Sequence, residues 1–586
     1  MSLIPRPSTP ARLLSPGAAK LPRWVLLAVG LLYIFAGLLF RDPWKSDDVI
    51  GLATMLTALN QGSPISLWLP QVGSLAYAEN GPLVTWVGLS FIKLFSPIFS
   101  WFTSDINAVI LASRLPNLLW FGLLTYFFWY GTYHLARSPE AQPLPLPFGG
   151  EPPASAYGRM VADAALLLLL ATVGILWRMH ESSSVPAMIA FQAWAYYCLG
   201  RVVERPLAAC LGLGLALGCA LLTRGFVGGI PIFLGSVAVF IWHPLLRRQL
   251  QWLLLSVLIA ALLFVAWWWP ARDLSLFWTQ TWLEWNTQSF AWPHWATGIK
   301  SLRDLSWFLW PTWPLALIGL WNWRRWHQAL HIVLPTSLLA SAFVCLFFYQ
   351  DPFEPEFALL AVPSAALAAF ALPTLRRGVI NTLDWFAVMC FSLTAAAVWL
   401  GWVAQQTGWP PKIAQSIARQ TEGFDNSISA LAVLVALVGS CAWVSLVIWR
   451  TRRHPPALWR GTVLSAGGLL ATWLLLVTLW LPTLDYARSY RGVSAELAQA
   501  LAQHQRTNEC VRGSQVALGQ RASFYVFDEI DLQFDQRCTL VVEQLDRKLY
   551  LQGLLPISDT DQELWLGRRG GDRHEMFRLV RRPAKP

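Results

Sequence analysis

Charged side chains are scarce in this sequence. Only 13% of its 586 residues are Asp, Glu, Lys or Arg, whereas 55% are hydrophobic, and the mean hydropathy is +0.45. Soluble proteins carry more charge than this, and repeated long apolar stretches are typical of proteins that cross a membrane several times. The composition therefore excludes a soluble globular chain and predicts a polytopic α-helical membrane protein.

Several motifs that would indicate other functions are missing. His180-Glu181 begins like the helix motif of zinc proteases, but position 184 is Ser, and that chemistry needs His at both i and i+4. No glycine-rich phosphate loop is present. The glycines that do occur, such as Gly214, are better explained by close packing between helices. No internal repeat of the kind expected in a transporter is seen. These absences exclude a metalloprotease and disfavour a transporter.

Cysteine is rare, and its spacing matches no metal-binding motif. Cys510 and Cys538 lie in the polar C-terminal part, where oxidising exterior conditions would allow a disulfide between them. The other six lie in apolar segments and are expected to behave as small hydrophobic residues, namely Cys198, Cys210, Cys219, Cys345, Cys390 and Cys441.

The net charge of +11 does not indicate a nucleic-acid partner. The basic residues lie in short clusters between apolar runs, which is typical of cytoplasmic loops that set membrane topology. We therefore expect membrane lipids, and no nucleic acid, around this chain.

We count about thirteen apolar runs near the ~20 residues that a membrane-spanning helix needs. The first run follows a basic segment without a small-residue cleavage site, so we expect a retained signal anchor. Basic clusters fall in alternate connections, which places the N-terminus in the cytoplasm and the part after Pro482 outside. The expected spans are 23–40, 108–136, 160–178, 187–204, 206–223, 226–246, 251–269, 307–322, 329–349, 357–375, 379–404, 428–449 and 461–483.

The chain divides into a cytoplasmic tail (1–22), a membrane domain (23–483) and an outer domain (484–586). Within the membrane domain, residues 43–107 are expected to form one long outer loop with two or three helices in the membrane interface. A span at Gly81 to Pro97 would instead move every later basic cluster to the outer face.

The outer domain has the composition of a soluble α/β fold. β-like runs cover Val516 to Phe527 and Thr539 to Gln544, and Ser494 to Gln505 has a helical pattern. We expect a small α/β domain of about 100 residues, within the usual size range of domains.

Acids and bases gather on the outer side of this topology. A carboxylate at the membrane edge is costly and by default marks a functional site, although an aspartate at a helix start also caps free N–H groups. For Arg178 and Arg224, snorkelling to the interface is the alternative. A functional role is favoured for Arg224, and a non-functional one for Arg178, Lys300 and Arg303. The acidic loop Asp351, Glu354 and Glu356 is expected to be solvated. The candidate site residues are Asp47, Asp48, Tyr77, Glu79, Arg178, His180, Glu181, Arg224, Glu284, His294, Lys300 and Arg303.

Four short motifs, in this order, resemble those of the C-type (GT-C) membrane glycosyltransferases. Their likeness is greatest to the bacterial lipid A aminoarabinose transferases and more distant to the protein mannosyltransferases. That family has W-x-P-D-E, Y-x-E-K-P, R-L-P-S and L-T-K-G, about thirteen spans and a small outer C-terminal domain. The corresponding residues here are Trp44-x-Ser-Asp47-Asp48, Tyr77-x-Glu79-x-x-Pro82-Leu, Ser113-Arg114-Leu115-Pro116 and Leu222-Thr223-Arg224-Gly225.

The resemblance assigns roles to individual positions. It implies that Asp47, with Asp48 beside it, is the catalytic acid–base group, and that Glu79 lies near a divalent metal ion (Mg, Mn or Zn) or the donor phosphate. Arg224 would bind the lipid phosphate. Arg178, Lys300 and Arg303 are expected to assist it, and Tyr77, His180, Glu181, Glu284 and His294 to contact substrate.

This chain also departs from the family pattern. Asp48 replaces Glu, Asn80-Gly81 replaces the Lys of E-K-P, and Ala187 stands where the T-P-D-M acid would be. The His180-Glu181 pair just upstream is a possible substitute for that acid.

The expected function is an inverting glycosyltransferase of the bacterial inner membrane. It would move a sugar from a polyprenyl-phosphate donor to a periplasmic-face acceptor, which would be lipid A, another envelope glycan or a protein hydroxyl. The alternative is a lipid-linked glycan transporter or a non-catalytic envelope-assembly protein, favoured by the changes at Asn80 and Ala187. A polymerase or ligase using pyrophosphate-linked glycans would need a large outer loop rich in Arg and His, which residues 270–306 match poorly.

Overall fold

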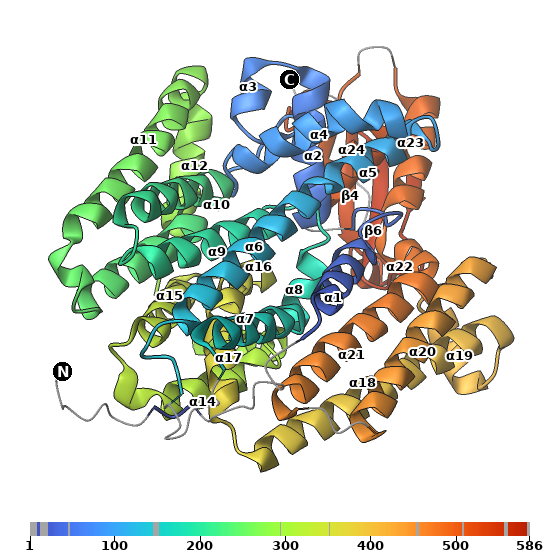
Figure 1. Cartoon of the computed structure of the whole chain (residues 1–586). Helices are drawn as coiled ribbons and strands as arrows, with labels where there is room; N and C mark the ends of the chain where they lie inside the picture. The colour runs from blue at the N-terminus through green and yellow to red at the C-terminus, as the bar shows by residue number, and fades with distance from the viewer. Residues whose placement is uncertain are drawn as a thin grey trace, which may run out of the picture.

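A computed structural model describes residues 9–11, 21–44, 47–143, 152–292, 295–350, 352–452, 456–506, 509–555 and 561–582. A large helical body extends to about residue 488, and a smaller domain containing a sheet follows it (Figure 1). The segment between the first two long apolar helical regions contains α2 (Asp47–Gln61), α3 (Pro64–Trp68), the antiparallel pair β1 (Gln71–Val72) and β2 (Leu75–Ala76), and α4 (Leu83–Phe99).

The rest of the body is built from helices and short 3₁₀ turns. The first half comprises α1 (Arg23–Phe35), α5 (Asp105–Arg114), α6 (Pro116–Ala136), α7 (Ala154–Leu170), α8 (Val173–Arg178), α9 (Val185–Arg201), α10 (Pro206–Trp242), η2 (Leu246–Arg248), α11 (Leu250–Leu274) and α12 (Leu276–Gln288). The second half comprises α13 (Trp295–Phe308), α14 (Thr312–Asn322), η3 (Arg324–Trp326), α15 (Leu330–Phe348), α16 (Glu354–Phe357), η4 (Ala358–Leu360), α17 (Ala361–Ala371), η5 (Leu372–Thr374), α18 (Arg377–Thr407), α19 (Pro411–Ala418), α20 (Ala430–Arg452), α21 (Ala457–Leu479) and α22 (Leu481–Arg488).

Eight helical stretches within the described ranges are long and apolar enough to cross a membrane. The count is lower than thirteen because several expected spans form shorter helices. In addition, one stretch, Pro206–Trp242, contains two of the expected spans. The chain is therefore a multi-pass membrane protein, while the number of thirteen spans stays a prediction. The eight stretches are Asp105–Ala136, Pro206–Trp242, Leu250–Leu274, Leu330–Phe348, Glu354–Thr374, Gly378–Thr407, Ala430–Arg452 and Trp459–Leu479.

The stretch α10 is not one straight helix. Arg224 and Gly225 have non-helical backbone angles, and Gly225 has φ +52°. A Cβ atom on Gly228 would lie 2.6 Å from the carbonyl oxygen of Ala220. Eight residues of straight helix would separate those positions by about 12 Å. The chain therefore folds back at Arg224-Gly225, between the two spans expected at 206–223 and 226–246.

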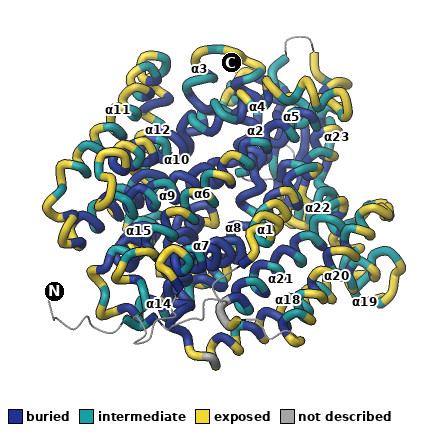
Figure 2. The backbone as a smooth tube through the Cα atoms, viewed as in Figure 1, coloured by how far each residue is buried: buried dark blue, intermediate teal, exposed yellow. Residues whose placement is uncertain are grey.

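Burial separates the central helices of the body from the peripheral ones (Figure 2). The Glu354–Thr374 stretch is 94% buried within the protein, whereas Gly378–Thr407 is only 11% buried. An apolar helix that the protein leaves uncovered needs an apolar solvent around it. The peripheral helices α11, α18 and α20 are therefore the lipid-facing surface, and α7, α9 and α17 form the core.

The C-terminal domain packs two main helices with a four-stranded sheet. The strand order is β3-β4-β6-β5, in which β3 pairs with β4 in parallel and the other neighbours are antiparallel. Cys510 and Cys538 are joined in a disulfide, with Cα atoms 5.1 Å apart. The elements are α23 (Arg491–His504), β3 (Val511–Ser514), α24 (Leu518–Asp528), β4 (Leu540–Asp546), α25 (Arg547–Leu551), β5 (Gln562–Gly567) and β6 (Glu575–Arg581).

The predicted strand at Val516 to Phe527 is wrong, because most of it forms the helix α24. Phe524 packs into the core of the domain, while Tyr525 and Val526 join the core of the helical body. A helix can present two faces to two partners in this way, so the tertiary contacts outweigh the β-propensity of the local residues. The helix predicted at Ser494 to Gln505 and the strand predicted at Thr539 to Gln544 are confirmed by α23 and β4.

Candidate active site

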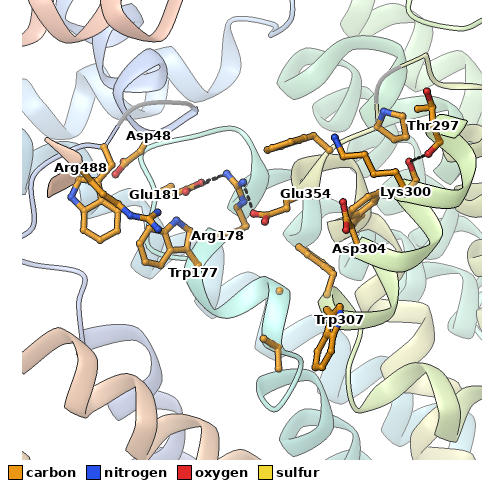
Figure 3. A pocket seen from close by; sticks show the side chains of 18 of the residues that line it. Asp48, Trp177, Arg178, Glu181, Thr297, Lys300, Asp304, Trp307, Glu354 and Arg488 are labelled. Carbon is orange, nitrogen blue, oxygen red and sulfur yellow. Dashed lines mark hydrogen bonds and ion pairs between the residues drawn. The ribbon is translucent and has the colours of Figure 1, made fainter. Parts of the chain in front are cut away.

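A cavity of about 1040 Å³ lies where the helical body meets the C-terminal domain. Trp177, Arg178 and Glu181 line one wall, and Lys300 and Trp307 of α13 line another (Figure 3). Arg569, from the connection between β5 and β6, lines it from the C-terminal domain. Both parts of the molecule thus contribute charged groups to one space.

Helix ends and turns bring the charged side chains to this region. Asp47 and Asp48 occupy the first turn of α2, where the partial positive charge of a helix N-terminus favours carboxylates. Arg178 ends α8, and Arg224 lies at the reversal in α10. The reversal needs glycine at position 225, because a Cβ atom there would lie 2.1 Å from Oδ1 of Asn286. That oxygen already accepts the Phe226 N–H at 2.8 Å.

Arg178 is bound by three carboxylates from separate parts of the chain. Its Nη1 lies 2.9 Å from Glu181 and 3.2 Å from Asp47, and its Nη2 lies 2.7 Å from Glu354 (Figure 3). The guanidinium is almost fully buried. The bonds to Glu181 and Glu354 have the length of strong charge-assisted hydrogen bonds, whereas the bond to Asp47 is longer.

Arg224 forms the second charged centre. Its Nη2 donates to Glu356 at 2.8 Å and lies 3.7 Å from Glu79, and its Nη1 donates to Ser184 Oγ at 3.3 Å. The Tyr77 hydroxyl donates to Glu79 at 3.3 Å. Three of the residues selected from the sequence, Tyr77, Glu79 and Arg224, thus lie together, although none of them lines the cavity.

Asp48 plays a different part from its neighbour Asp47. Its carboxylate lies 2.9 Å from Arg41 and 3.1 Å from Arg114, and it accepts the Ser182 N–H at 2.8 Å. All of these side chains are buried. Asp48 therefore anchors α2 to the body through two guanidiniums and a backbone amide.

Burial raises the pKa of two carboxyl groups that lie in loops of this site, Glu181 and Glu79. Burial raises the pKa of Glu181 to about 7, although Arg178 opposes the effect. Burial also raises the pKa of Glu79, against the effect of Arg224, and Asp47 and Glu356 add to the rise. A carboxyl group with a pKa near 7, as in Glu181, exchanges protons near neutral pH, which is a common property of catalytic sites. The Asp47 and Arg224 centres are thus electrostatically linked through Glu79.

His180 lies beneath the cavity wall instead of lining it. Its ring is fully buried, with Nδ1 2.6 Å from the carbonyl oxygen of Leu176 and Nε2 2.8 Å from that of Tyr33. Burial lowers the pKa of His180 to about 4, so the ring is neutral at physiological pH. The ring therefore packs beneath the turn that carries Glu181, and its contact with substrate stays a prediction.

The remaining predicted residues are scattered. Lys300 lines the cavity from α13. Arg303 is mainly exposed, paired with Asp304 at 2.9 Å, and Glu284 is exposed on α12; neither lines the cavity. His294 lies outside the described residues. The structure therefore brings Lys300 to the site but not Arg303 or Glu284.

The residues around Glu79 do not form a set of metal ligands. The described part of the chain contains no group of three or more His, Cys, Asp or Glu side chains that could hold a metal ion. Glu79 instead faces Arg224 and Tyr77. The divalent ion stays a prediction, and no step of the chemistry below depends on it.

Sequence reasoning missed several charged residues of this region. The solvated loop expected here is wrong for Glu356, which is buried against Arg224, whereas Glu354 is half exposed and also paired with Arg178; Asp351 lies outside the described residues. Arg114 could have been identified as a site residue from the R-L-P-like motif in which it lies. For Arg41, only its position before Asp42-Pro43 pointed to such a role. The residues missed are Arg41, Arg114, Glu354, Glu356, Arg488 and Arg569.

The structure thus combines a multi-pass helical body, a small α/β domain and a charged cavity between them. The chain is similar to ArnT from Cupriavidus metallidurans in two solved structures. The one bound to undecaprenyl phosphate has a TM-score of 0.64 and 15% identity, and the apo one has 0.61 and 16%. Each comparison covers 95% of this chain and 97% of the other.

This likeness establishes the fold, as the resemblance in the sequence predicted. No family model matches the chain, and no curated protein matches it by sequence.

Proposed function

We propose that this protein is an inner-membrane glycosyltransferase that moves a sugar from a polyprenyl phosphate to an acceptor in the outer leaflet, either lipid A or another envelope glycan. The main support is that Asp47 lies within 3.2 Å of a buried guanidinium, Arg178, at the edge of a cavity large enough for a sugar and a phosphate. The ArnT structure of the same fold holds undecaprenyl phosphate. This fits a lipid-linked anionic donor.

The proposed chemistry uses one carboxylate and the nearby cations. The acceptor hydroxyl attacks C1 of the sugar from the face opposite the phosphate, so a new C1–O bond forms as the C1–O bond to phosphate breaks. Asp47 takes the hydroxyl proton. The phosphate leaves with the bonding electrons, and the positive potential of Arg178, Arg224 and Lys300 stabilises its charge. Attack from the opposite face inverts the configuration at C1.

Glu181 supports this proposal at a position where the family acid is missing. Ala187 is fully buried and offers no carboxylate. Glu181 instead brings a carboxylate into contact with Arg178 from the turn just upstream. This position supports Glu181 as the residue that we propose to substitute for the missing acid.

The test is the Asp47→Asn variant in a purified transfer assay. Loss of a general base is expected to lower kcat by about 10²–10⁴-fold while leaving folding and membrane insertion intact. Asp105→Asn is the matched control, because Asp105 also begins a helix but is exposed and lies outside the cavity lining. Full activity of Asp47→Asn would remove Asp47 from this role.

A lipid-linked glycan transporter is the second candidate, favoured by the Asn80 and Ala187 substitutions. Purified protein incubated with labelled polyprenyl-phosphate sugar separates the two. An enzyme releases free polyprenyl phosphate and labels an acceptor, whereas a transporter leaves the donor intact and moves it across a vesicle membrane.

A further inference from the structure

The three carboxylates on Arg178 differ sharply in solvent exposure. The Glu181 side chain is 2% exposed and that of Asp47 is 17% exposed, whereas the Glu354 side chain is 52% exposed. Arg178 itself is 5% exposed. The guanidinium is thus held by two inner carboxylates and one that faces solvent.

The guanidinium also divides its donors between these partners. Nη1 serves both Glu181 and Asp47, while Glu354 alone accepts from Nη2. Figure 3 shows Arg178 between Glu181 and Glu354, with Lys300 reaching into the same cavity from α13. Within the described residues, the one hydrogen-bond acceptor of Arg178 Nη2 is Glu354, which itself lines the cavity.

The other buried guanidinium of the site, Arg224, makes its shorter ion pair with a buried carboxylate, while Glu79, which is 32% exposed, lies farther away at 3.7 Å. Arg224 is 4% exposed and its partner Glu356 is 5% exposed. Separating a buried pair leaves an uncompensated charge and is strongly unfavourable. A half-exposed carboxylate, by contrast, is stabilised little by its ion pair and readily finds water. An incoming anion thus displaces Glu354 from Arg178 far more easily than Glu356 from Arg224.

We propose that Glu354 is an internal competitor of the donor phosphate: its carboxylate occupies Nη2 of Arg178 until the phosphate of a polyprenyl-phosphate lipid displaces it. This inference rests on the proposed function. A phosphate presents several acceptor oxygens to a planar guanidinium, so it binds Arg better than one carboxylate oxygen does. Lys300, on the opposite wall, offers the displaced carboxylate a second cation. Glu354 therefore sets donor affinity without taking part in bond making.

The experiment compares Glu354→Gln with Asp304→Asn in the full-length protein. Both substitutions remove one negative charge from the cavity lining and keep the side-chain shape, but Asp304 is paired with Arg303 and does not contact Arg178. The probe is sugar-free polyprenyl phosphate in detergent micelles. Binding is followed by the fluorescence of tryptophans that line the cavity, such as Trp177 and Trp307.

Glu354→Gln is expected to tighten polyprenyl-phosphate binding by about two- to fivefold, the range that an exposed ion pair supports. Asp304→Asn is expected to change it much less. The KM for donor should fall in Glu354→Gln, while kcat stays within about twofold because Glu354 makes no contact that is specific to the transition state.

Two results would overturn the inference. Unchanged or weaker binding in Glu354→Gln would mean that Glu354 holds Arg178 in place instead of competing for it. Equal tightening in both variants would mean that only the overall charge of the cavity matters. In either case wild-type protein that still binds and uses the donor leaves the proposed function standing, whereas wild-type protein that binds no polyprenyl phosphate ends both proposals.

Discussion

At the scale of single residues, two adjacent aspartates have separate tasks because of burial. Asp48 is fully enclosed and balances Arg41 and Arg114, whereas Asp47 keeps 17% of its side chain exposed beside Arg178. Asp48 lines the cavity, but its carboxylate is engaged by two guanidiniums and the Ser182 amide, whereas Asp47 contacts Arg178 and keeps part of its side chain exposed. In the proposed mechanism Asp47 is therefore the reactive carboxylate and Asp48 the anchoring one.

Asp48→Asn should destabilise the protein, unlike Asp47→Asn. Removing the Asp48 charge leaves two buried guanidiniums uncompensated, which costs about 3–5 kcal/mol for a buried ion pair. We expect a clear fall in Tm for Asp48→Asn in detergent-purified protein, and a Tm close to wild type for Asp47→Asn. An unchanged Tm in Asp48→Asn would contradict the anchoring role.

The raised pKa of Glu181, about 7, predicts an acid limb in the pH–rate profile. Above pH 7 the ionised Glu181 shares Arg178 with Asp47; as the pH falls through 7, Glu181 takes up a proton and Arg178 is drawn toward Asp47. Transfer should therefore slow below pH 7. In Glu181→Gln the rate should be reduced at pH 8 and this limb should disappear. A wild-type-like limb in Glu181→Gln would assign it to another group.

At the scale of elements, the reversal within α10 decides where Arg224 lies. In a straight helix from Pro206 to Trp242, Arg224 would lie near the middle of the helix, inside the body. The reversal instead places it beside Ser184 and Glu356, at the end of two antiparallel segments. Its positive φ at Gly225 is a conformation that side chains with a Cβ adopt at a cost.

Gly225→Ala should disrupt this reversal. Backbone strain alone costs about 1–3 kcal/mol, and the new Cβ atom would also collide with Asn286. We expect a lower Tm and a lower yield of folded protein from membranes. Gly122→Ala is the control, because nothing lies within 4 Å of a Cβ atom there and alanine favours the helix. Equal stability of the two variants would contradict the constraint at Gly225.

At the scale of the whole molecule, the cavity depends on the junction between the helical body and the C-terminal domain. Across this junction, Arg491 of α23 donates to both oxygens of Asp42 at 2.6 and 3.0 Å. Within the helical body just before it, Trp44 Nε1 donates to Asp485 of α22 at 2.7 Å. Burial raises the pKa of Asp485 to about 7, and Asp42 adds to the rise. These contacts, together with Arg569, place the domain over the same end of the body as Asp47.

The C-terminal domain and the cavity should therefore lie on one side of the membrane, the periplasmic side. In a background with Cys390 and Cys441 replaced by Ser, a membrane-impermeant maleimide applied to spheroplasts should label Leu551→Cys, in the exposed helix α25. It should not label Arg248→Cys, in the connection after α10, until the membrane is opened. Labelling in the reverse order would invert the topology.

Hydropathy and charge clustering determined the membrane class of this protein, and the order of short motifs predicted its fold. Both signals are local: an apolar run has to find lipid or a protein core wherever it lies. Asp47, Asp48 and Arg224 could also be selected from the sequence, because a charged side chain at the membrane edge is costly unless it has a function.

Only the tertiary structure decided which charges meet. Arg178 and Glu354 are 176 positions apart, and Arg224 and Glu356 are 132 apart, so no local pattern distinguishes Glu356 from a solvated loop residue. Contacts with two cores likewise favour the helix α24, although the local sequence pattern is β-like. An ion pair or a two-sided helix depends on the position of a distant partner, and that position is a property of the whole packed chain.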